Sequence, residues 1–269
     1  MTEFAINDRA ANYGDGLFST MKVQRQQVAL YERHIARLLH DAYRLGLTLD
    51  EQSLRREILE QAKQLAEGTL KVLISAGEGG RGYARTHLNR PGLHCSFSPL
   101  PDYYSGWQSN GITLGISNIA LARQPLLGGL KHTNRLEQVL IKQAIPDDVD
   151  DVLVCDEQGC LVEASAANVF WQTGNRWYTP QINQCGVAGV MRSFVIDQLS
   201  GDNMAFEVGR YNLQSLQHGK CVFICNALMQ IVPVHTLRLA DNTLRFSVAP
   251  VTQMWHKWQA AYQGEYGSL

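Results

Sequence analysis

The residue with the most distinctive chemical setting is Lys131, within the stretch GLKHTNRLEQVLIK at positions 129–142. An amphipathic helix is predicted from Asn134 onward, with Asn134 and Glu137 as its capping box. Its apolar residues recur at three- and four-residue steps: Leu136, Val139, Leu140 and Ala144. Lys131 would then precede a helix N-terminus, whose partial positive charge lowers the pKa of a nearby ammonium. A neutral lysine amine forms Schiff bases. The alternative is that Lys131 simply points into water.

A second candidate is Glu163, the only charged residue between Glu157 and Arg176. Strand alternation in CLVEASAANVFW places it on one face with Leu161 and Ser165. A carboxylate in an apolar strand needs a partner, such as a buried cation or the protonated nitrogen of a pyridine ring. The alternative is a position on a solvated rim.

Two loops and one arginine are candidates for holding an anion. In CGVAGVMR, the amides of Val190 and Met191 open a helix, and Gly189 allows close approach. The segment CNALMQIVPV offers a second nest of amides at Ala227 and Leu228. Neither a P-loop nor a dinucleotide fingerprint is present.

The arginine is Arg37, on a predicted helix with Asp41 one turn later. Its guanidinium fork suits a phosphate. An ordinary i,i+4 ion pair between the two side chains is the alternative, and it contributes about 0.3 to 0.5 kcal/mol.

Composition excludes several classes of function. The chain has 269 residues, 45% of them hydrophobic, with 24 basic and 25 acidic side chains. The sequence contains no basic run with interleaved aromatic residues, so nucleic acid binding is not expected. No apolar stretch has signal-peptide or membrane-span length, so a cytoplasmic protein without a membrane partner is expected. The six cysteines form no CxxC pair and the eight histidines no ligand spacing, so no metal is expected.

The elements that must position these residues form two predicted domains. Residues 1–100 combine strands with helices over 32–46 and after Asp50, and contain a glycine-rich loop. Residues 101–109, within the stretch SPLPDYYSGWQSNG with its two prolines and several polar residues, form the expected linker, and residues 110–269 are richer in strands. This α+β organisation predicts a cofactor in the cleft between the domains.

Five ordered motifs, HIARL, LKHTNRL, LVEASAANVF, GVMR and NALMQIVPV, resemble those of the class IV pyridoxal-phosphate family over nearly the whole chain. That family contains branched-chain and D-amino acid aminotransferases and 4-amino-4-deoxychorismate lyase. The resemblance implies fold type IV, with a small N-terminal α/β sandwich-like domain and a larger C-terminal β-barrel-like domain with flanking helices. It also implies a homodimer with pyridoxal 5'-phosphate as cofactor.

The resemblance further implies roles for individual residues. Lys131 would bond to the cofactor, Glu163 would bind the pyridine nitrogen, and Arg37 would hold the phosphate. The amides of Val190, Met191 and Leu228 would complete the phosphate cradle, and Thr20 would lie beside the reacting carbon. The sequence departs from the aminotransferases at Met191, where they usually have threonine, and at NAL, which replaces a hydroxyl-bearing triplet.

Within the family, YGDGLFST, GEGGRGY, LKHTNRLEQVL and GVMR are most similar to the lyase. The implied reaction converts a small-molecule substrate, 4-amino-4-deoxychorismate, into 4-aminobenzoate and pyruvate, as in folate biosynthesis. Arg81 and Tyr83 in the glycine-rich loop, and Arg123, are the candidates for binding the substrate carboxylates. The alternatives are an aminotransferase that needs a 2-oxo acid, and a binding protein that has kept the fold without the chemistry.

Overall fold

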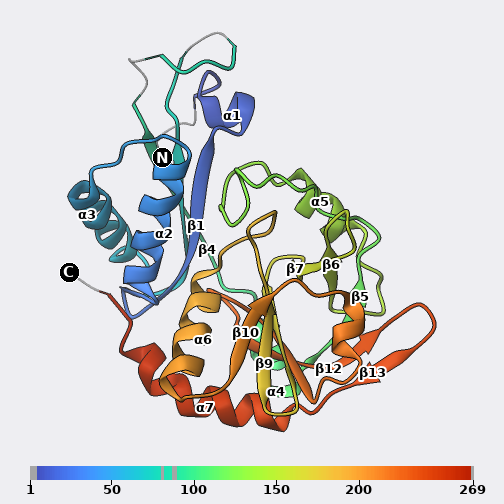
Figure 1. Cartoon of the computed structure of the whole chain (residues 1–269). Coiled ribbons are helices and arrows are strands. Elements are labelled where there is room, and N and C mark those ends of the chain that lie inside the picture. Colours follow the sequence, from blue (N-terminus) through green and yellow to red (C-terminus); the bar gives the residue numbers. More distant parts are fainter. Residues whose placement is uncertain (1–4, 80–81, 87–89, 268–269) are drawn as a thin grey trace. The chain divides into compact units, whose positions relative to one another are not determined.

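The computed structural model describes residues 5–79, 82–86 and 90–267 (Figure 1). Contacts divide the chain into two compact units. The first consists of Met1–Leu100, Leu130–Arg135 and Gln263–Leu269, and the second of Pro101–Gly129 and Leu136–Tyr262.

The first unit is a four-stranded sheet with two helices packed on one face. Its elements are α1 (Arg9–Tyr13), β1 (Gly16–Gln24), β2 (Gln27–Val28), α2 (Tyr31–Arg44), α3 (Glu51–Ala62), β3 (Glu67–Ser75) and β4 (Gly92–Ser98). The strand order is β2-β1-β3-β4, with antiparallel neighbours. Leu17 and Met21 of β1 pack with Ile35 and Leu38 of α2 in a buried core. Asp50 caps α3 as predicted, because its carboxylate accepts from the amide of Ser53.

Segments distant in sequence complete the first unit. Val28 and Gly267 exchange two backbone hydrogen bonds of 2.9 Å, and Arg33 forms an ion pair with Glu265. The amide of Phe18 donates to the carbonyl of Lys131 (2.9 Å), which adds residues 131–133 to the edge of β1.

The second unit is built on one large mixed sheet in the order β10-β9-β8-β11-β12-β5-β6-β7, with β13 paired to β12. Its strands are β5 (Ile112–Ile116), β6 (Asp151–Cys155), β7 (Leu161–Ala164), β8 (Asn168–Thr173), β9 (Arg176–Pro180), β10 (Phe206–Gly209), β11 (Cys221–Asn226), β12 (Gln230–Arg238) and β13 (Thr243–Arg245). Its helices are α4 (Tyr104–Asn110), α5 (Leu136–Gln143), α6 (Val190–Gly201), the 3₁₀ helix η1 (Leu213–Leu216) and α7 (Ala249–Gln263). The expected α+β fold with a β-rich second part is confirmed.

Two helices of the second unit lie side by side (Figure 1). The indole of Trp258 on α7 donates to Asp202 at the end of α6 (2.8 Å), and the rings of Phe194 and Tyr262 meet edge to face. These contacts pack the buried aromatic residues of α7 against α6.

Two segments depart from the predicted division at residues 101–109 and 110–269. Most of the predicted linker belongs to α4, whose Gln108 donates to the carbonyl of Met229 (2.7 Å). Lys131 was expected in the second domain but belongs to the first unit, since its segment hydrogen-bonds to β1.

The predicted capping box is also wrong. α5 begins at Leu136, the Asn134 side chain donates to the carbonyl of Gly14 (2.9 Å), and Glu137 accepts from the amide of Ala122 (2.8 Å). Gly14 has φ +62°, and a Cβ there would lie 2.1 Å from Oδ1 of Asn134, so only glycine suits this contact.

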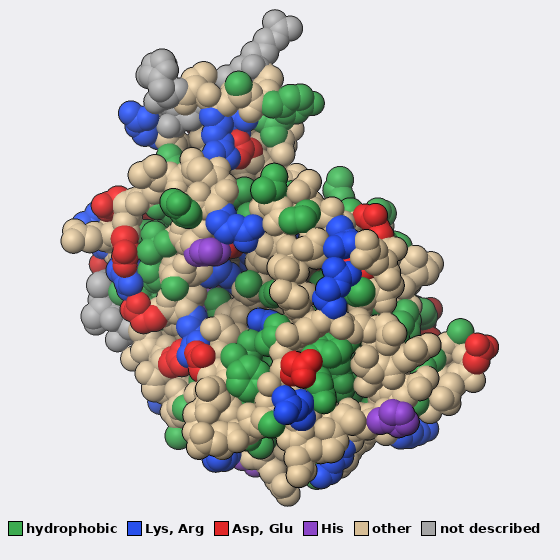
Figure 2. Space-filling model, viewed as in Figure 1, with side chains coloured by type: hydrophobic (Ala, Val, Ile, Leu, Met, Phe, Trp, Pro, Cys, Tyr) green, Lys and Arg blue, Asp and Glu red, His purple; other side chains and the backbone are tan. Residues whose placement is uncertain are grey.

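Charge on the visible surface is mixed. On the face shown in Figure 2, basic and acidic side chains are interspersed with uncharged surface. No helix of the described residues is long and apolar enough to cross a membrane.

Candidate active site

Lys131 lies on the edge of β1 in the first unit. Its amide donates to Oδ2 of Asp41 (3.0 Å), and its Nζ lies 4.4 Å from the centroid of the Phe18 ring. Arg135 stabilises the loop by donating to the carbonyls of Leu130 (2.6 Å) and His132 (2.9 Å). These contacts hold the lysine in a half-buried position and contradict the alternative of a side chain that simply points into water.

Arg37 lies on α2, where it contacts β1. Its Nη2 donates to Oγ of Ser19 (2.6 Å), and Ser19 in turn contacts Nδ1 of His34 (2.6 Å). Burial lowers the pKa of Arg37 to about 10, while Asp41 raises it and Arg135 lowers it further. Asp41, one turn later on the same helix, accepts from the Lys131 amide. The hydrogen bonds of Arg37 and Asp41 thus go to Ser19 and Lys131, unlike those of the simple i,i+4 pair considered as the alternative.

Thr20 lies on the sheet face opposite to α2. It alternates with Ser19 along β1 and therefore shares a face with Phe18, whose ring contacts Lys131. Lys71 of β3 pairs with Thr20, and its Nζ lies 4.9 Å from the same Phe18 ring. Lys131, Thr20 and Lys71 thus belong to one face, although the sequence reasoning did not include Lys71.

Glu163 is buried in β7 of the second unit, with 4% of its surface exposed. Its Oε2 accepts from the amide of Val187 (3.0 Å). The alternative of a solvated rim position is therefore wrong. The whole of β7 is buried, so strand alternation by itself did not reveal this.

The N-terminus of α6 fits an anion. Gly189 is its N-cap and provides no side-chain cap for the first amides, those of Val190 and Met191. A Cβ at Gly189 would lie 2.2 Å from Oδ1 of Asn168, whose Nδ2 donates to the carbonyl of Val187 (2.9 Å). Asn168, which the sequence reasoning missed, fixes the loop that leads into the helix.

The second predicted nest is partly occupied. The amides of Leu228 and Met229 both donate to Oδ1 of Asn226 at 2.9 Å, a turn of the Asx type. The amide of Leu228 therefore already has a protein acceptor. Of the two amides predicted to hold an anion, that of Ala227 therefore remains the candidate.

The predicted substrate-binding residues have different surroundings. Arg81 lies outside the described residues. Tyr83 is 88% exposed, and its carbonyl accepts from buried Arg9 (2.6 Å). Arg123 donates to Oε1 of Gln184 (2.8 Å), and its Nε lies 3.5 Å from Oδ2 of Asp156.

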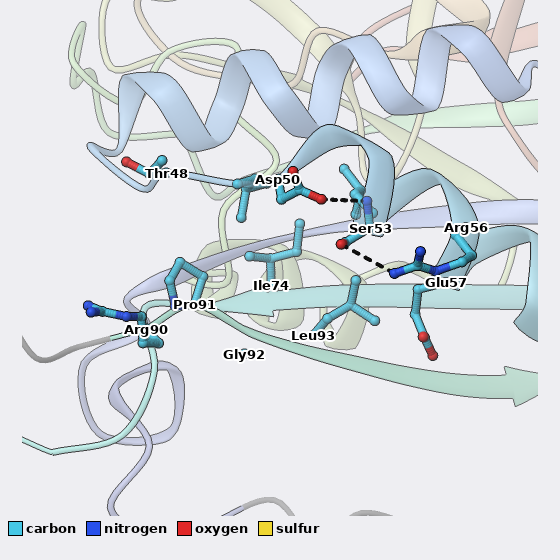
Figure 3. A pocket seen from close by; sticks show the side chains of 12 residues that line it. Thr48, Asp50, Ser53, Arg56, Glu57, Ile74, Arg90, Pro91, Gly92 and Leu93 are labelled. Atoms are coloured by element: carbon cyan, nitrogen blue, oxygen red, sulfur yellow. Dashed lines mark hydrogen bonds between the residues drawn. The ribbon is translucent and has the colours of Figure 1, made fainter.

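A cavity of about 510 Å³ beside α3 contains none of the predicted site residues (Figure 3). Its lining includes Asp50, which caps α3, and Arg56, which donates to Ser53. These charged side chains have structural partners, so the cavity offers no evident catalytic set. Among the described residues, no group of three or more histidine, cysteine and acidic side chains forms a metal site.

Each unit contains groups of the kind that pyridoxal phosphate requires. The Nε of Arg37 is buried without a hydrogen-bond partner, and the α6 N-terminus has no side-chain cap. The Nε of Arg37 can donate to a phosphate, and the first amides of α6 can form a cradle for it. Glu163 supplies the buried carboxylate that would hold a ring nitrogen protonated, and Lys131 supplies the amine.

Comparisons with known proteins agree with this chemistry. A protein from Vibrio harveyi, named aminodeoxychorismate lyase, is 32% identical over 94% of each chain. The crystal structure of 4-amino-4-deoxychorismate lyase from Pseudomonas aeruginosa matches with a TM-score of 0.91 and 34% identity, covering 97% of this chain and 96% of that one.

The same fold occurs in aminotransferases. A branched-chain aminotransferase from Escherichia coli matches with a TM-score of 0.84 over 98% of this chain and 91% of its own, at 18% identity. The model of the family described as amino-transferase class IV matches residues 16–237. The chain therefore belongs to the amino-transferase class IV family.

Proposed function

We propose that the protein is a pyridoxal-phosphate-dependent lyase that converts 4-amino-4-deoxychorismate into 4-aminobenzoate and pyruvate. The observation that carries this proposal is the full-length likeness, at 32% and 34% identity, to two proteins named for that lyase activity. A relative named as a branched-chain aminotransferase is less similar, at 25% identity.

The chain's own residues have distinct tasks in this reaction. Pyridoxal phosphate, when bound, supplies a cationic ring that accepts the electrons of a broken C–H bond. Lys131 would hold the cofactor through its amine, and the same amine, once free, would remove the proton from the substrate carbon that carries nitrogen. Glu163 holds a proton on the ring nitrogen, and Arg37 with the amides of Val190 and Met191 holds the phosphate.

Thr20 is the proposed proton donor to the leaving enolpyruvate oxygen. It lies on the sheet face that also carries Phe18 and, through the Phe18 ring, Lys131. Loss of the proton and of enolpyruvate makes the six-membered ring of the substrate aromatic, and its amino group stays on the product. The cycle therefore needs no 2-oxo acid.

The substrate carboxylates need cationic partners, and Lys71 is an additional candidate beside Arg81, Tyr83 and Arg123. The ammonium groups of Lys71 and Lys131 both contact the Phe18 ring, at 4.9 and 4.4 Å. The two Nζ atoms are therefore no farther apart than the sum of these distances. A carboxylate on a substrate bound at Lys131 is thus within reach of Lys71.

A homodimer is proposed from an exposed apolar stripe. Leu136, Val139 and Leu140 lie on one face of α5 and are exposed, as is Leu126. The amphipathic pattern that predicted this helix therefore does not correspond to a face buried within the unit. A second copy of the chain would remove this apolar surface from water, at about 25 cal/mol per Å².

The test is to incubate the purified holoenzyme with 4-amino-4-deoxychorismate, without any amino acid or 2-oxo acid. Equal release of 4-aminobenzoate and pyruvate over many turnovers per cofactor is expected. An enzyme that carries the cofactor but releases neither product would contradict the lyase and favour an aminotransferase. A protein that gains no visible absorption band with pyridoxal phosphate would favour the non-catalytic binding protein.

A further inference from the structure

A short buried chain of hydrogen bonds leads from the sheet of the first unit to Arg37. Ser19 of β1 and His34 of α2 are both fully buried, with 0% exposure. Oγ of Ser19 lies 2.6 Å from Nδ1 of His34 and 2.6 Å from Nη2 of Arg37. A single hydroxyl thus joins the imidazole to the guanidinium.

The direction of the bond between Arg37 and Ser19 follows from the chemistry of the guanidinium. A guanidinium only donates, so Ser19 must accept from Arg37. The Ser19 hydroxyl can also donate to Nδ1 of His34 or accept from it, depending on the tautomer of the neutral ring. Burial and the charges of Arg37 and Lys131 lower the pKa of His34 well below 6.5, in agreement with a neutral ring.

This arrangement fixes Arg37 while leaving part of its fork available. Nη2 is engaged by Ser19, whereas Nε is buried without a hydrogen-bond partner among the described residues. A long arginine side chain loses rotamer freedom when it binds a ligand, and a fork that is already held loses less. Ser19 and His34 act through Arg37 and do not themselves need to contact the ligand.

We propose that Ser19 and His34 are positioning residues that hold Arg37 ready to bind the phosphate ester of the cofactor. This inference rests on the proposed function, because it takes Arg37 as a phosphate ligand. Its consequence is selective: loss of the Ser19 hydroxyl weakens the hold on the phosphate group and leaves the hold on the pyridine ring unchanged.

The test compares two ligands that differ only in the phosphate. Apoprotein is titrated with pyridoxal phosphate and with pyridoxal, and binding is followed by the visible absorption band. Ser19→Ala is expected to raise the dissociation constant for pyridoxal phosphate about tenfold and to leave that for pyridoxal unchanged. Ser19→Thr, which keeps the hydroxyl, is expected to restore the affinity for pyridoxal phosphate.

The matched control is Ser75→Ala. Ser75 is also fully buried in this sheet, but its hydroxyl donates to Asp8 (2.8 Å). This variant should lose a similar hydrogen bond without changing the ratio of the two affinities. His34→Leu should reproduce the selective loss seen with Ser19→Ala, and His34→Gln, whose amide can still hydrogen-bond to the Ser19 hydroxyl, should restore part of it.

Equal weakening of both ligands by Ser19→Ala, or no weakening of either, would overturn the inference. A different result would reach further: if the wild-type apoprotein binds neither ligand, the proposed function itself fails. These outcomes are separable because the wild-type titration is read before any variant is compared.

Discussion

At the scale of single residues, the site depends on how charged groups are held as much as on which groups are present. Asp41 accepts from the Lys131 amide, Ser19 accepts from Arg37, and Glu163 accepts from the Val187 amide. Each functional side chain or its backbone is therefore tied to a neighbour by a hydrogen bond. Substitutions should consequently separate positioning effects from chemical ones.

Lys71 provides one such separation. Lys71→Met keeps the length of the side chain but removes its charge, so a substrate carboxylate would lose a partner. We expect KM to rise about tenfold, with a smaller change in kcat, because a charge-assisted contact contributes roughly 1.5 to 3 kcal/mol. The measurement is steady-state release of 4-aminobenzoate. Lys63→Met, at the C-cap of α3, is the matched control, and an equal rise in its KM would argue against a role specific to Lys71.

His132 should make stability depend on pH. Burial, then Arg135 and Lys131, lower the pKa of His132 from 6.5 to about 4. Between these values the unfolded chain binds more protons, so the free energy of unfolding falls as pH falls, by up to about 1.4 kcal/mol per pH unit. Urea denaturation at several pH values should show a flatter profile for His132→Asn. An unchanged profile would contradict this prediction, and the exposed His256→Asn is the control.

At the scale of elements, the N-terminus of α6 shows how a glycine creates a binding site. At Gly189 the backbone conformation is ordinary, with φ −67° and ψ 139°. The requirement for glycine comes instead from Asn168, whose Oδ1 occupies the place of a Cβ. The sequence alone indicated close approach here but did not identify the neighbour that enforces it.

Gly189→Ala should displace Asn168 and loosen the loop that carries Val187. We expect a loss of about 1 to 3 kcal/mol in the free energy of unfolding, together with weaker binding of pyridoxal phosphate. Gly201→Ala, at the other end of the same helix, is the control, since a Cβ there has no neighbour within 4 Å. Urea denaturation measures both variants, and equal stabilities would refute the steric explanation.

How much could be predicted from the sequence differs between elements. The apolar period predicted α2 well, and Ile35, Leu38 and Ala42 are buried as that period requires. The same kind of pattern misled at α5, where Ile141 is buried but Leu136 and Leu140 are exposed. Periodicity reports which side of a helix is apolar, and it does not report whether that side faces the same chain.

Candidates for the site could be selected from the sequence where one residue type carries the chemistry. Lys131, Glu163 and Arg37 could be selected from charge, spacing and family motifs. Ser19, His34, Asn168 and Lys71 could not, because their importance arises from contacts between strands and helices distant in sequence. The hydrogen bond from the Leu228 amide to the Asn226 side chain likewise depends on a local turn that composition does not specify.

At the scale of the whole molecule, the exposed stripe on α5 leads to a prediction about assembly. Sedimentation velocity should show a wild-type dimer, whereas the double variant Leu136→Asp and Leu140→Asp should be monomeric. Both substitutions place charge on the apolar stripe, so pairing would bury unpartnered carboxylates. Val208→Asp, an exposed apolar residue of β10, is the control. A wild-type monomer at working concentration would disprove the dimer.

The discontinuous first unit has a consequence for synthesis on the ribosome. Val28 can pair with Gly267, and Arg33 with Glu265, only after the intervening residues have been translated. At about 5 to 20 residues per second, the delay is roughly tens of seconds. During that time the edge of β2 that Gly267 later occupies is open to pairing with other nascent chains. The unit that contains Lys131 is thus begun before the second unit is translated and is completed only after it.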